Sequence, residues 1–322
     1  MSLEVIHVVR HGYRSSFTVD PATGTYSASI RSPTGIPTDP PLTSYGVEQA
    51  NELADHLLKF DPPIDLVYSS PYYRCLQTIN PFVAKRNHTT SSAGDSPNVS
   101  SSKQHEIRVE GGISEWFGSA PWPHPLPAPL NKLREFFPNI DKDYVSQVTP
   151  PINGETLSQL HDRIASAMDK IIVQCDQEGT KSIIVCSHAA AIIALGRVLT
   201  GRMPKSVDEE DFAAFTCGLS TYRRRKETAD HHSSTATTCT SPPEWKNGNG
   251  VRGGWTCEAD SDCSFLRGGP ERGWRFSGEE TFDAVGTQSL AGSGAGLGVD
   301  VEVQGPEGRK SRDRPTTDGS KL

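Results

Sequence analysis

The chain opens on a short apolar run at residues 5–9 that stops at Arg10-His11-Gly12. A near-continuous apolar run of this length is typical of a parallel strand that is buried on both faces. In open α/β sheets, ligands bind at the carboxyl ends of such strands. The three residues after the run suit a phosphate, because an imidazole can attack phosphorus, a guanidinium can hold phosphate oxygens and a glycine lets the backbone come close. The run therefore predicts a central strand with a ligand site at its end.

The rest of the chain alternates apolar strand-like runs with helical patterns. The expected strands lie at residues 3–9, 65–69, 107–109 and 182–186, within 212–224 and at 254–266, and the expected helices at 43–58, 71–84, 156–172 and 189–199. Thr43 provides a helix N-cap, and Gly201 ends the last helix. Because strands that alternate with helices form parallel sheets covered on both faces, the predicted fold is α/β, a three-layer α/β/α sandwich with a mostly parallel central sheet.

Composition divides the chain into one domain and a tail. The 322 residues include 29 glycines and 24 prolines, and only 34% are apolar, so sizeable parts are expected to lie outside the core. We expect one domain over residues 1–285, with a disordered insertion at 87–104 and a mobile loop at 227–250. A disordered tail is expected at 286–322. The segment 13–41, rich in Ser, Thr, Pro and Gly, is predicted to be a long loop near the first site.

Charge and hydropathy argue against several classes of protein. The net charge of −7 argues against a general nucleic-acid binder, so direct binding of nucleic acid is not expected. The longest apolar stretch, residues 189–195, is far too short to span a bilayer. The chain enters its first strand with no signal peptide before it, and its seven scattered cysteines fit buried, reduced thiols. We therefore expect no membrane association and a location in the cytoplasm or nucleus.

Three later segments add chemistry to His11. Arg74 follows the second predicted strand, and Glu115 lies beside Trp116. His188 stands where a strand ends and a helix begins, a position that favours anions. Each residue alone has an ordinary interpretation, namely a hydrogen-bonded linker for a histidine, a solvated face for an arginine and a surface loop for a glutamate. Together, cations and imidazoles at strand ends favour a phosphoryl-transfer site.

These motifs, in this order, resemble the histidine phosphatase superfamily, in the branch that includes the phosphoglycerate mutases. The resemblance runs from residue 3 to about residue 225. It implies that His11 is a nucleophile that forms a phosphohistidine and that Glu115 is the proton donor. It also implies a set of side chains around the transferred phosphoryl group: Arg10, Arg74 and His188.

The chemistry sets requirements for these groups. A phosphomonoester dianion repels attack, so cations must neutralise its oxygens. His11 must be neutral, which requires its other ring nitrogen to be fixed as a donor, with the backbone as the expected acceptor. Glu115 must be protonated to release the alcohol and then ionised to activate water, and packing on Trp116 together with phosphate charge is expected to raise its pKa. No metal or other cofactor is needed.

Two further groups have alternative interpretations. Arg14 lies shortly after His11, where the ecdysteroid-phosphate and tyrosine-phosphatase-like members of the superfamily also carry an arginine. We expect Arg14 to reach the phosphate or the entrance, and a surface position is the alternative. Late cysteines and histidines lack the paired C-x-x-C spacing of zinc sites, so no metal site is expected at Cys239, Cys257, Cys263, His231 and His232.

The sequence departs from the mutases where mutases are most recognisable. After RHG a mutase carries a Trp-Asn pair within several residues, whereas residues 15–17 here are Ser-Ser-Phe. Glu115 is followed by Trp-Phe-Gly in place of the mutase segment Arg-His-Tyr-Gly. The predicted reaction is therefore hydrolysis of a phosphomonoester, on a small molecule or a phosphoprotein, and mutase activity is the less favoured alternative.

A second hypothesis comes from a fungal subgroup. The segments 10–15, 39–43 and 255–274 resemble fungal proteins that include the histidine-phosphatase-like tau subunit of the RNA polymerase III general transcription factor. This resemblance implies transcription-complex subunits as partners and a phosphatase domain that acts mainly as a binding module. Because the catalytic residues are all present, the site is expected to be active in either case. The basic cluster at 309–314 is either a nuclear signal or a solvated tail.

Overall fold

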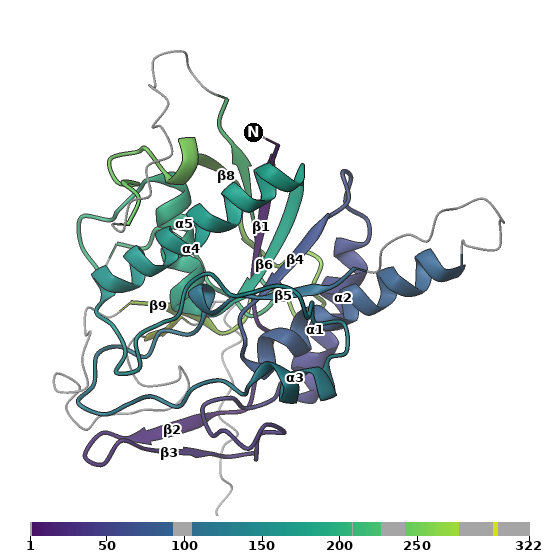
Figure 1. Cartoon of the computed structure of the whole chain (residues 1–322). Helices are drawn as coiled ribbons and strands as arrows, with labels where there is room; N and C mark the ends of the chain where they lie inside the picture. Colours follow the sequence, from purple (N-terminus) through teal and green to yellow (C-terminus); the bar gives the residue numbers. More distant parts are fainter. Residues whose placement is uncertain (1, 93–104, 208, 227–241, 277–298, 302–322) are drawn as a thin grey trace, which may run out of the picture.

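The computed structural model describes residues 2–92, 105–207, 209–226, 242–276 and 299–301. The strands of its central sheet are β1 (Val5–Arg10), β4 (Leu66–Ser69), β5 (Ile107–Val109), β6 (Ser182–Ser187), β7 (Leu219–Arg224) and β8 (Trp255–Asp262). Their order across the sheet is β5-β4-β6-β1-β7-β8 (Figure 1). The strands β5, β4, β6 and β1 are parallel, whereas β7 is antiparallel to both β1 and β8. The predicted mostly parallel sheet is confirmed.

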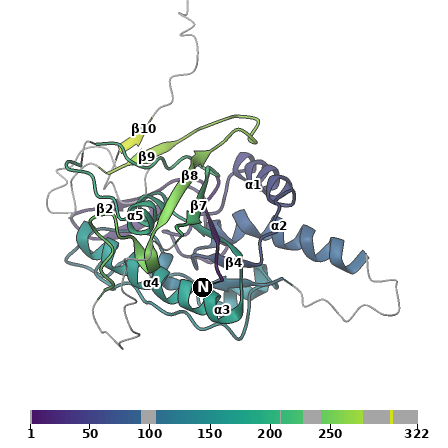
Figure 2. The same cartoon turned by 90° about the horizontal axis from the view of Figure 1, so that it is seen from above.

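Helices cover both faces of the sheet. They are α1 (Ser44–Leu57), α2 (Tyr73–Ser92), α3 (Leu130–Phe136), α4 (Leu157–Glu178) and α5 (Ala189–Thr200). One hydrophobic core joins α1, α2 and α3 to Val9 and Ile184, and the other joins α4 and α5 to Val8 and Val185. Because successive strand residues face opposite sides, β1 and β6 feed both cores. The predicted α/β/α sandwich is therefore confirmed, with its layers visible in Figures 1 and 2.

Local sequence signals explain the starts of α1 and α4 and the end of α5. Thr43 caps α1 and accepts a hydrogen bond from Gly46 N. Thr156 caps α4 in a capping box with Gln159, which satisfies two backbone donors at once. Gly201 follows α5 in the left-handed region, at φ 76°. Within the part of the chain that the structure describes, no helix is both long enough and apolar enough to cross a membrane. The cysteines among the described residues are free thiols.

The expectation of a long loop at 13–41 is wrong in part. This segment contains a hairpin of β2 (Phe17–Asp20) and β3 (Thr25–Ala28). Phe17 and Val19 are buried and alternate with exposed neighbours, a strand pattern too short to stand out among polar residues. The Tyr26 hydroxyl and His124 Nδ1 lie 2.6 Å apart, which joins the hairpin to the segment that follows Glu115.

The disordered insertion expected at 87–104 is wrong in part. Helix α2 continues to Ser92, so residues 87–92 are helical, and 93–104 lie outside the described residues. The two ends of this segment are joined by Asn87, whose Nδ2 donates to the His105 carbonyl at 3.0 Å. Its Oδ1 accepts from His105 N at 2.8 Å.

The mobile loop expected at 227–250 and the tail expected at 286–322 are wrong in part. Residues 227–241 lie outside the described residues, but 242–250 are packed, with Trp245 only 2% exposed and stacked on His161. Within the tail, β10 (Val299–Val301) pairs with β9 (Gly273–Arg275), and the rest lies outside the described residues. The polar composition of 242–250 predicted a mobile loop because it gave no indication that one side chain, Trp245, is buried and anchors the segment. In the segment 212–224 only Leu219–Arg224 is a strand.

This packing predicts that Trp245→Ala lowers the free energy of unfolding by about 3–5 kcal/mol, the usual loss when a buried tryptophan is truncated. Denaturant unfolding of the full chain would measure the change. The control is Glu244→Ala at the neighbouring exposed residue, for which we expect a change within about 0.5 kcal/mol. Equal stability of the two variants would mean that 242–250 is as mobile as the composition suggested.

Candidate active site

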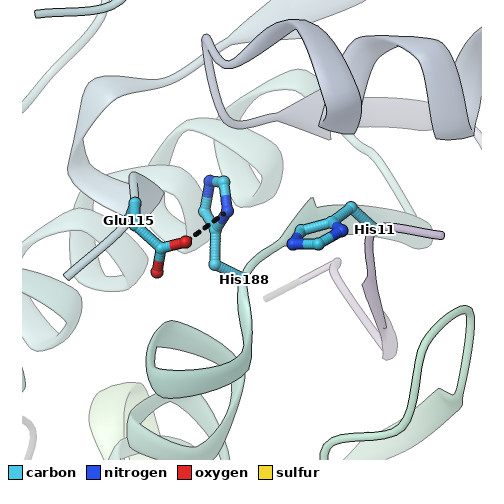
Figure 3. Close-up of side chains that lie close together, drawn as sticks. All are labelled: His11, Glu115 and His188. Atoms are coloured by element: carbon cyan, nitrogen blue, oxygen red, sulfur yellow. Dashed lines mark ion pairs between the residues drawn. The ribbon is translucent and has the colours of Figure 1, made fainter. Parts of the chain in front are cut away.

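Three side chains from distant parts of the chain meet at the carboxyl edge of the parallel strands. His11 follows β1, Glu115 lies after the short 3₁₀ helix η1 (Gly111–Ile113), and His188 is the N-cap residue of α5. One side-chain nitrogen or oxygen atom from each of the three lies within 4.8 Å of the other two. Figure 3 shows the ring of His188 between Glu115 and His11. The structure thus brings together residues that the sequence singled out separately.

Strand register explains why the two histidines meet. Arg10 at the end of β1 pairs with Ser187 at the end of β6, and each histidine is the next residue along its strand. His11 N donates to the Ser187 carbonyl at 2.9 Å, which extends the pairing past the strand ends. The ring centroids of His11 and His188 are 5.4 Å apart. Parallel pairing therefore fixes the spacing of the two imidazoles.

His11 is held as a neutral imidazole of defined tautomer. Its side chain is 2% exposed, and Nδ1 lies 2.8 Å from the Gly12 carbonyl. Since a carbonyl only accepts, Nδ1 carries the proton and donates, which leaves Nε2 unprotonated. The acceptor of the His11 Nδ1 hydrogen bond is thus a backbone carbonyl, as the proposed chemistry led us to expect. The pKa of His11 is lowered well below its usual value by burial and then by the charges of Arg74, His188, Arg10 and Arg14.

Gly12 lets the loop after β1 pack closely against α1. A Cβ at this position would lie 2.8 Å from the Gly46 carbonyl oxygen and 3.3 Å from Cys217 Sγ. Gly12 N also donates to Thr78 Oγ1 at 3.0 Å. The glycine is therefore required by the approach of α1, and this approach fixes the backbone whose carbonyl orients His11.

Arg74, in the first turn of α2, is the buried cation of the site. Its Nη2 donates to Glu115 Oε2 at 2.9 Å, and its Nη1 donates to the Thr38 carbonyl at 2.9 Å. Asp39 Oδ1 lies 3.5 Å from Nη1, and the Tyr72 ring stacks under the guanidinium at 4.6 Å. A buried arginine needs such charge and hydrogen-bond partners to offset its lost hydration. Arg74 thus joins its own segment to two others, residues 38–39 and the loop that carries Glu115.

Asp39 is a site residue to which the sequence assigned no role. It is fully buried, and burial raises its pKa to about 6 against the opposing charge of Arg74. Its segment 39–43 was recognised only as a resemblance, and the polar loop around it gave no sign of its contact with Arg74. In the sequence, Asp39 is a single carboxylate in an otherwise uncharged stretch. Such a residue gives no indication of which distant side chain it will contact.

His188 contacts groups on both sides of its ring. Nε2 lies 2.7 Å from Ser70 Oγ and 3.5 Å from Cys75 Sγ, and Nδ1 lies 3.2 Å from Glu115 Oε2. Burial disfavours the charged ring, but the neighbouring Cys75 and Glu115 outweigh burial and raise the pKa of His188. Glu115 Oε2 and Ser70 Oγ therefore lie close to the two ring nitrogens, one on each side of the ring. Neither Ser70 nor Cys75 was singled out from the sequence.

The expectation of a raised pKa for Glu115 is wrong for the site without a bound phosphate. Burial does raise the pKa of Glu115, but His188 and then Arg74 outweigh burial and lower it below its usual range. The Trp116 indole Nε1 donates to the Glu155 carbonyl at 2.8 Å and anchors the loop. Glu115 is therefore an ionised partner of two cations.

Arg10 lies beside His11 but is bonded to the backbone. Its Nη1 donates to the Ala214 carbonyl at 2.6 Å and to the Arg272 carbonyl. These carbonyls come from two late segments of the chain, which the sequence did not connect with the site. Arg10 is buried, and its charge acts on His11.

Arg14 lies at the site rather than on a remote surface. Its guanidinium is 4.8 Å from the centre of the Phe17 ring, which places it against the β2–β3 hairpin. Its charge also helps to lower the pKa values of His11 and Glu115, behind the larger effects of burial and the nearer cations. That Arg14 reaches the phosphate or the entrance stays a prediction.

His11, Glu115 and His188 are residue types that bind metal ions in other proteins. The same atoms are already shared with a cation, because Arg74 Nη2 lies 2.9 Å from Glu115 Oε2 and 3.1 Å from His188 Nδ1. Further positive charge would be repelled there. A dianionic phosphoryl group has the opposite sign and suits the guanidinium and imidazole donors.

Comparisons with known proteins point the same way. A family model described as the histidine phosphatase superfamily (branch 1) matches residues 6–94 and 99–235. The transcription factor tau 55 kDa subunit of Saccharomyces cerevisiae is 30% identical over 286 residues, which cover 86% of this chain and 59% of that protein. The ecdysteroid-phosphate phosphatase of Drosophila melanogaster is 32% identical over 183 residues, which cover 55% of this chain and 22% of that protein.

A solved structure shares the fold. The crystal structure of the ecdysone phosphate phosphatase from Bombix mori in complex with tungstate has a TM-score of 0.51 at 20% identity, and the match covers 68% of this chain and 89% of that one. The aligned regions span less than two thirds of the length of the two curated relatives, 59% and 22%. The match of the family model to most of the chain is decisive: the chain belongs to the histidine phosphatase superfamily, branch 1.

Proposed function

We propose that this chain hydrolyses phosphomonoesters through a phosphohistidine on His11. The observation that carries the proposal is the hydrogen bond from His11 Nδ1 to the Gly12 carbonyl, which leaves a neutral Nε2 among cationic side chains. A neutral nitrogen fixed by backbone is what nucleophilic attack on phosphorus requires. Membership of the superfamily and the likeness to an ecdysteroid-phosphate phosphatase support the same reaction.

Substrate binding changes the partners of Arg74 and Glu115. In the site without phosphate, Arg74 and His188 are bonded to the ionised Glu115 carboxylate. A phosphoryl dianion competes for these donors, and Arg10 and Arg14 add positive charge around it. Its negative charge beside Glu115 raises the pKa of that carboxyl, so the group takes up a proton when the substrate binds. The expected raised pKa of Glu115 thus belongs to the substrate complex.

The reaction then proceeds in two steps. His11 Nε2 attacks phosphorus, the phosphorus–oxygen bond to the alcohol breaks, and Glu115 gives its proton to the leaving oxygen. In the second step the Glu115 carboxylate accepts a proton from water, whose oxygen attacks the phosphohistidine. Inorganic phosphate leaves, and His11 and the protonated Glu115 are restored. The cations stabilise the charge on the equatorial oxygens in both transition states.

The likeness to a tau subunit supports a second, compatible function. It extends over 86% of this chain at 30% identity, well beyond the part shared with the ecdysteroid-phosphate phosphatase. We propose that the chain is a subunit of a transcription factor complex of this kind, with its phosphatase domain also used for binding. Such a role would place the protein in the nucleus, one of the two compartments expected. A mutase reaction is not favoured by either relative.

For the nucleophile, we expect His11→Ala to abolish hydrolysis of p-nitrophenyl phosphate while the circular dichroism spectrum and melting temperature stay near those of the wild type. The physical reason is the loss of the only imidazole nitrogen assigned to attack phosphorus. The matched control is His161→Ala, another buried histidine, which should lose stability but keep its turnover per folded molecule. Undiminished turnover in the His11 variant would refute the assignment.

For the acid, we expect Glu115→Gln to slow hydrolysis of alkyl phosphates by about 10²–10⁴, the usual contribution of general acid catalysis. An activated aryl ester, whose leaving group needs no proton, should be slowed far less. Calorimetry of phosphate binding near pH 6.5, in buffers of different ionisation enthalpy, should show fewer protons taken up by Glu115→Gln than by the wild type. Equal losses on both esters and equal proton uptake would remove Glu115 from the role of acid.

For the complex, we expect the tagged full chain to co-purify with the other subunits of a transcription factor, identified by mass spectrometry. His11→Ala should co-purify with the same subunits, because binding does not need the chemical step. The same material should hydrolyse aryl phosphate only when His11 is present. Recovery of the chain without such subunits, together with strong turnover, would instead indicate a free-standing phosphatase.

A further inference from the structure

A buried arginine outside the catalytic cluster contacts the loop that carries Glu115. Arg163 lies on α4, and its side chain is 4% exposed. Its Nη1 donates to two backbone carbonyls of this loop, Gly112 at 3.0 Å and Ser114 at 3.1 Å. Ser114 immediately precedes Glu115. The guanidinium therefore fixes the backbone on the amino-terminal side of the carboxylate.

Glu155 completes the contact on the other side. Arg163 Nε donates to Glu155 Oε1 at 2.8 Å and to Oε2 at 3.1 Å, and Nη2 also donates to Oε1. The backbone carbonyl of Glu155 accepts the Trp116 indole hydrogen bond at 2.8 Å. Trp116 immediately follows Glu115. The Arg163–Glu155 pair therefore binds both sequence neighbours of Glu115, through a carbonyl on one side and an indole on the other.

The loop is also seated tightly against α4. A Cβ at Gly112 would lie 2.6 Å from the Ala167 Cβ and 2.8 Å from the Val148 Cβ, so the backbone touches the helix surface. Ser187, the residue before His188, donates from Oγ to the Ile113 carbonyl at 2.6 Å. These contacts tie the loop to α4 and to β6, so movement of Arg163 would be transmitted to Glu115.

The energetics of buried ion pairs favour a role for Arg163 and Glu155 in positioning the loop rather than in stabilising the fold. Replacing a buried ion pair by apolar residues of similar volume is often neutral or stabilising, so such a pair is weak evidence of a stabilising role. The Arg163 fork, however, satisfies two loop carbonyls and one carboxylate at once, which a lysine cannot do. What the pair provides is a fixed position for the segment 112–116.

We propose that Arg163 and Glu155 are positioning residues that hold the Glu115 carboxyl at the leaving oxygen of the substrate. The inference rests on the proposed role of Glu115 as the acid. Proton transfer to a leaving group needs heavy atoms within hydrogen-bond reach, and a misplacement of about 1 Å can cost about 10² in rate. The pair reaches the site through the loop that carries Glu115, whereas His11 is held by the Gly12 and Ser187 carbonyls.

The test is the dependence of rate on the leaving group in Arg163→Lys, which keeps the charge but loses the fork. We expect kcat/KM for an alkyl phosphate to fall about 10–10²-fold, in line with a misplaced acid. An activated aryl phosphate should lose at most a few-fold, and competitive inhibition by inorganic phosphate should be unchanged. In the double variant with Glu115→Gln, the alkyl ester should show no further loss, because the two changes remove the same proton transfer.

The matched control is Arg224→Lys. Arg224 forms a mostly buried ion pair with Asp176 at the opposite end of the sheet, where it also donates to the Leu3 carbonyl. This variant should lose stability to a similar degree but keep the wild-type ratio of alkyl to aryl rates. If Arg163→Lys does not fold, Glu155→Gln serves as the second variant, since it removes the carboxylate while the carbonyl contacts of Arg163 stay available.

Two results would overturn the inference. One is an equal loss on both esters in the Arg163 and Glu155 variants, and the other is a loss that adds fully to that of Glu115→Gln. Failure of the proposed function looks different, because Glu115→Gln would then itself show no dependence on the leaving group. The single variant at Glu115 thus separates an error about the acid from an error about the residues that position it.

Discussion

The site depends on one buried guanidinium and the acceptors around it. Arg74 cannot remain charged in the core without partners, and it finds them in Glu115, Asp39 and the Thr38 carbonyl. Those partners come from the segment after β3 and from the loop after β5, while Arg74 itself begins α2. The ion pairs therefore define where three otherwise unrelated pieces of chain meet the ends of β1 and β6. Without that cation, Asp39 would lose its ion-pair partner and Glu115 would keep only His188.

The same arrangement explains how one carboxylate can serve two protonation states. In the structure Glu115 is neutralised by Arg74 and His188, and its pKa lies below the usual range despite its burial. A phosphoryl group carries the charge that these cations prefer, so its arrival removes their support from Glu115. In the proposed reaction, the change between base and acid follows from competition between two anions for the same cations.

Much of this architecture was predictable from residues with strong local signals. The apolar runs ending at Arg10 and Ser187 gave the central strands, and parallel pairing then placed His11 beside His188. What the sequence could not provide were contacts between segments with weak patterns. The β2–β3 hairpin has only four residues in each strand, and Trp245 is a single anchor in a polar stretch. The predicted rise in the pKa of Glu115 was wrong for a related reason. The direction of the shift depends on the distances from Glu115 to Arg74 and His188, and only the folded chain sets these distances.

The pair of hydrogen bonds between Asn87 and His105 has a consequence for the length of the chain between these two residues. These two hydrogen bonds bring the end of α2 and the residues before β5 to a common point, away from the catalytic edge. The entropy of closing a loop grows only slowly with its length. Evolution can therefore lengthen or shorten the chain between these two residues with little penalty, whereas a single inserted residue in β1 or β6 would displace an imidazole.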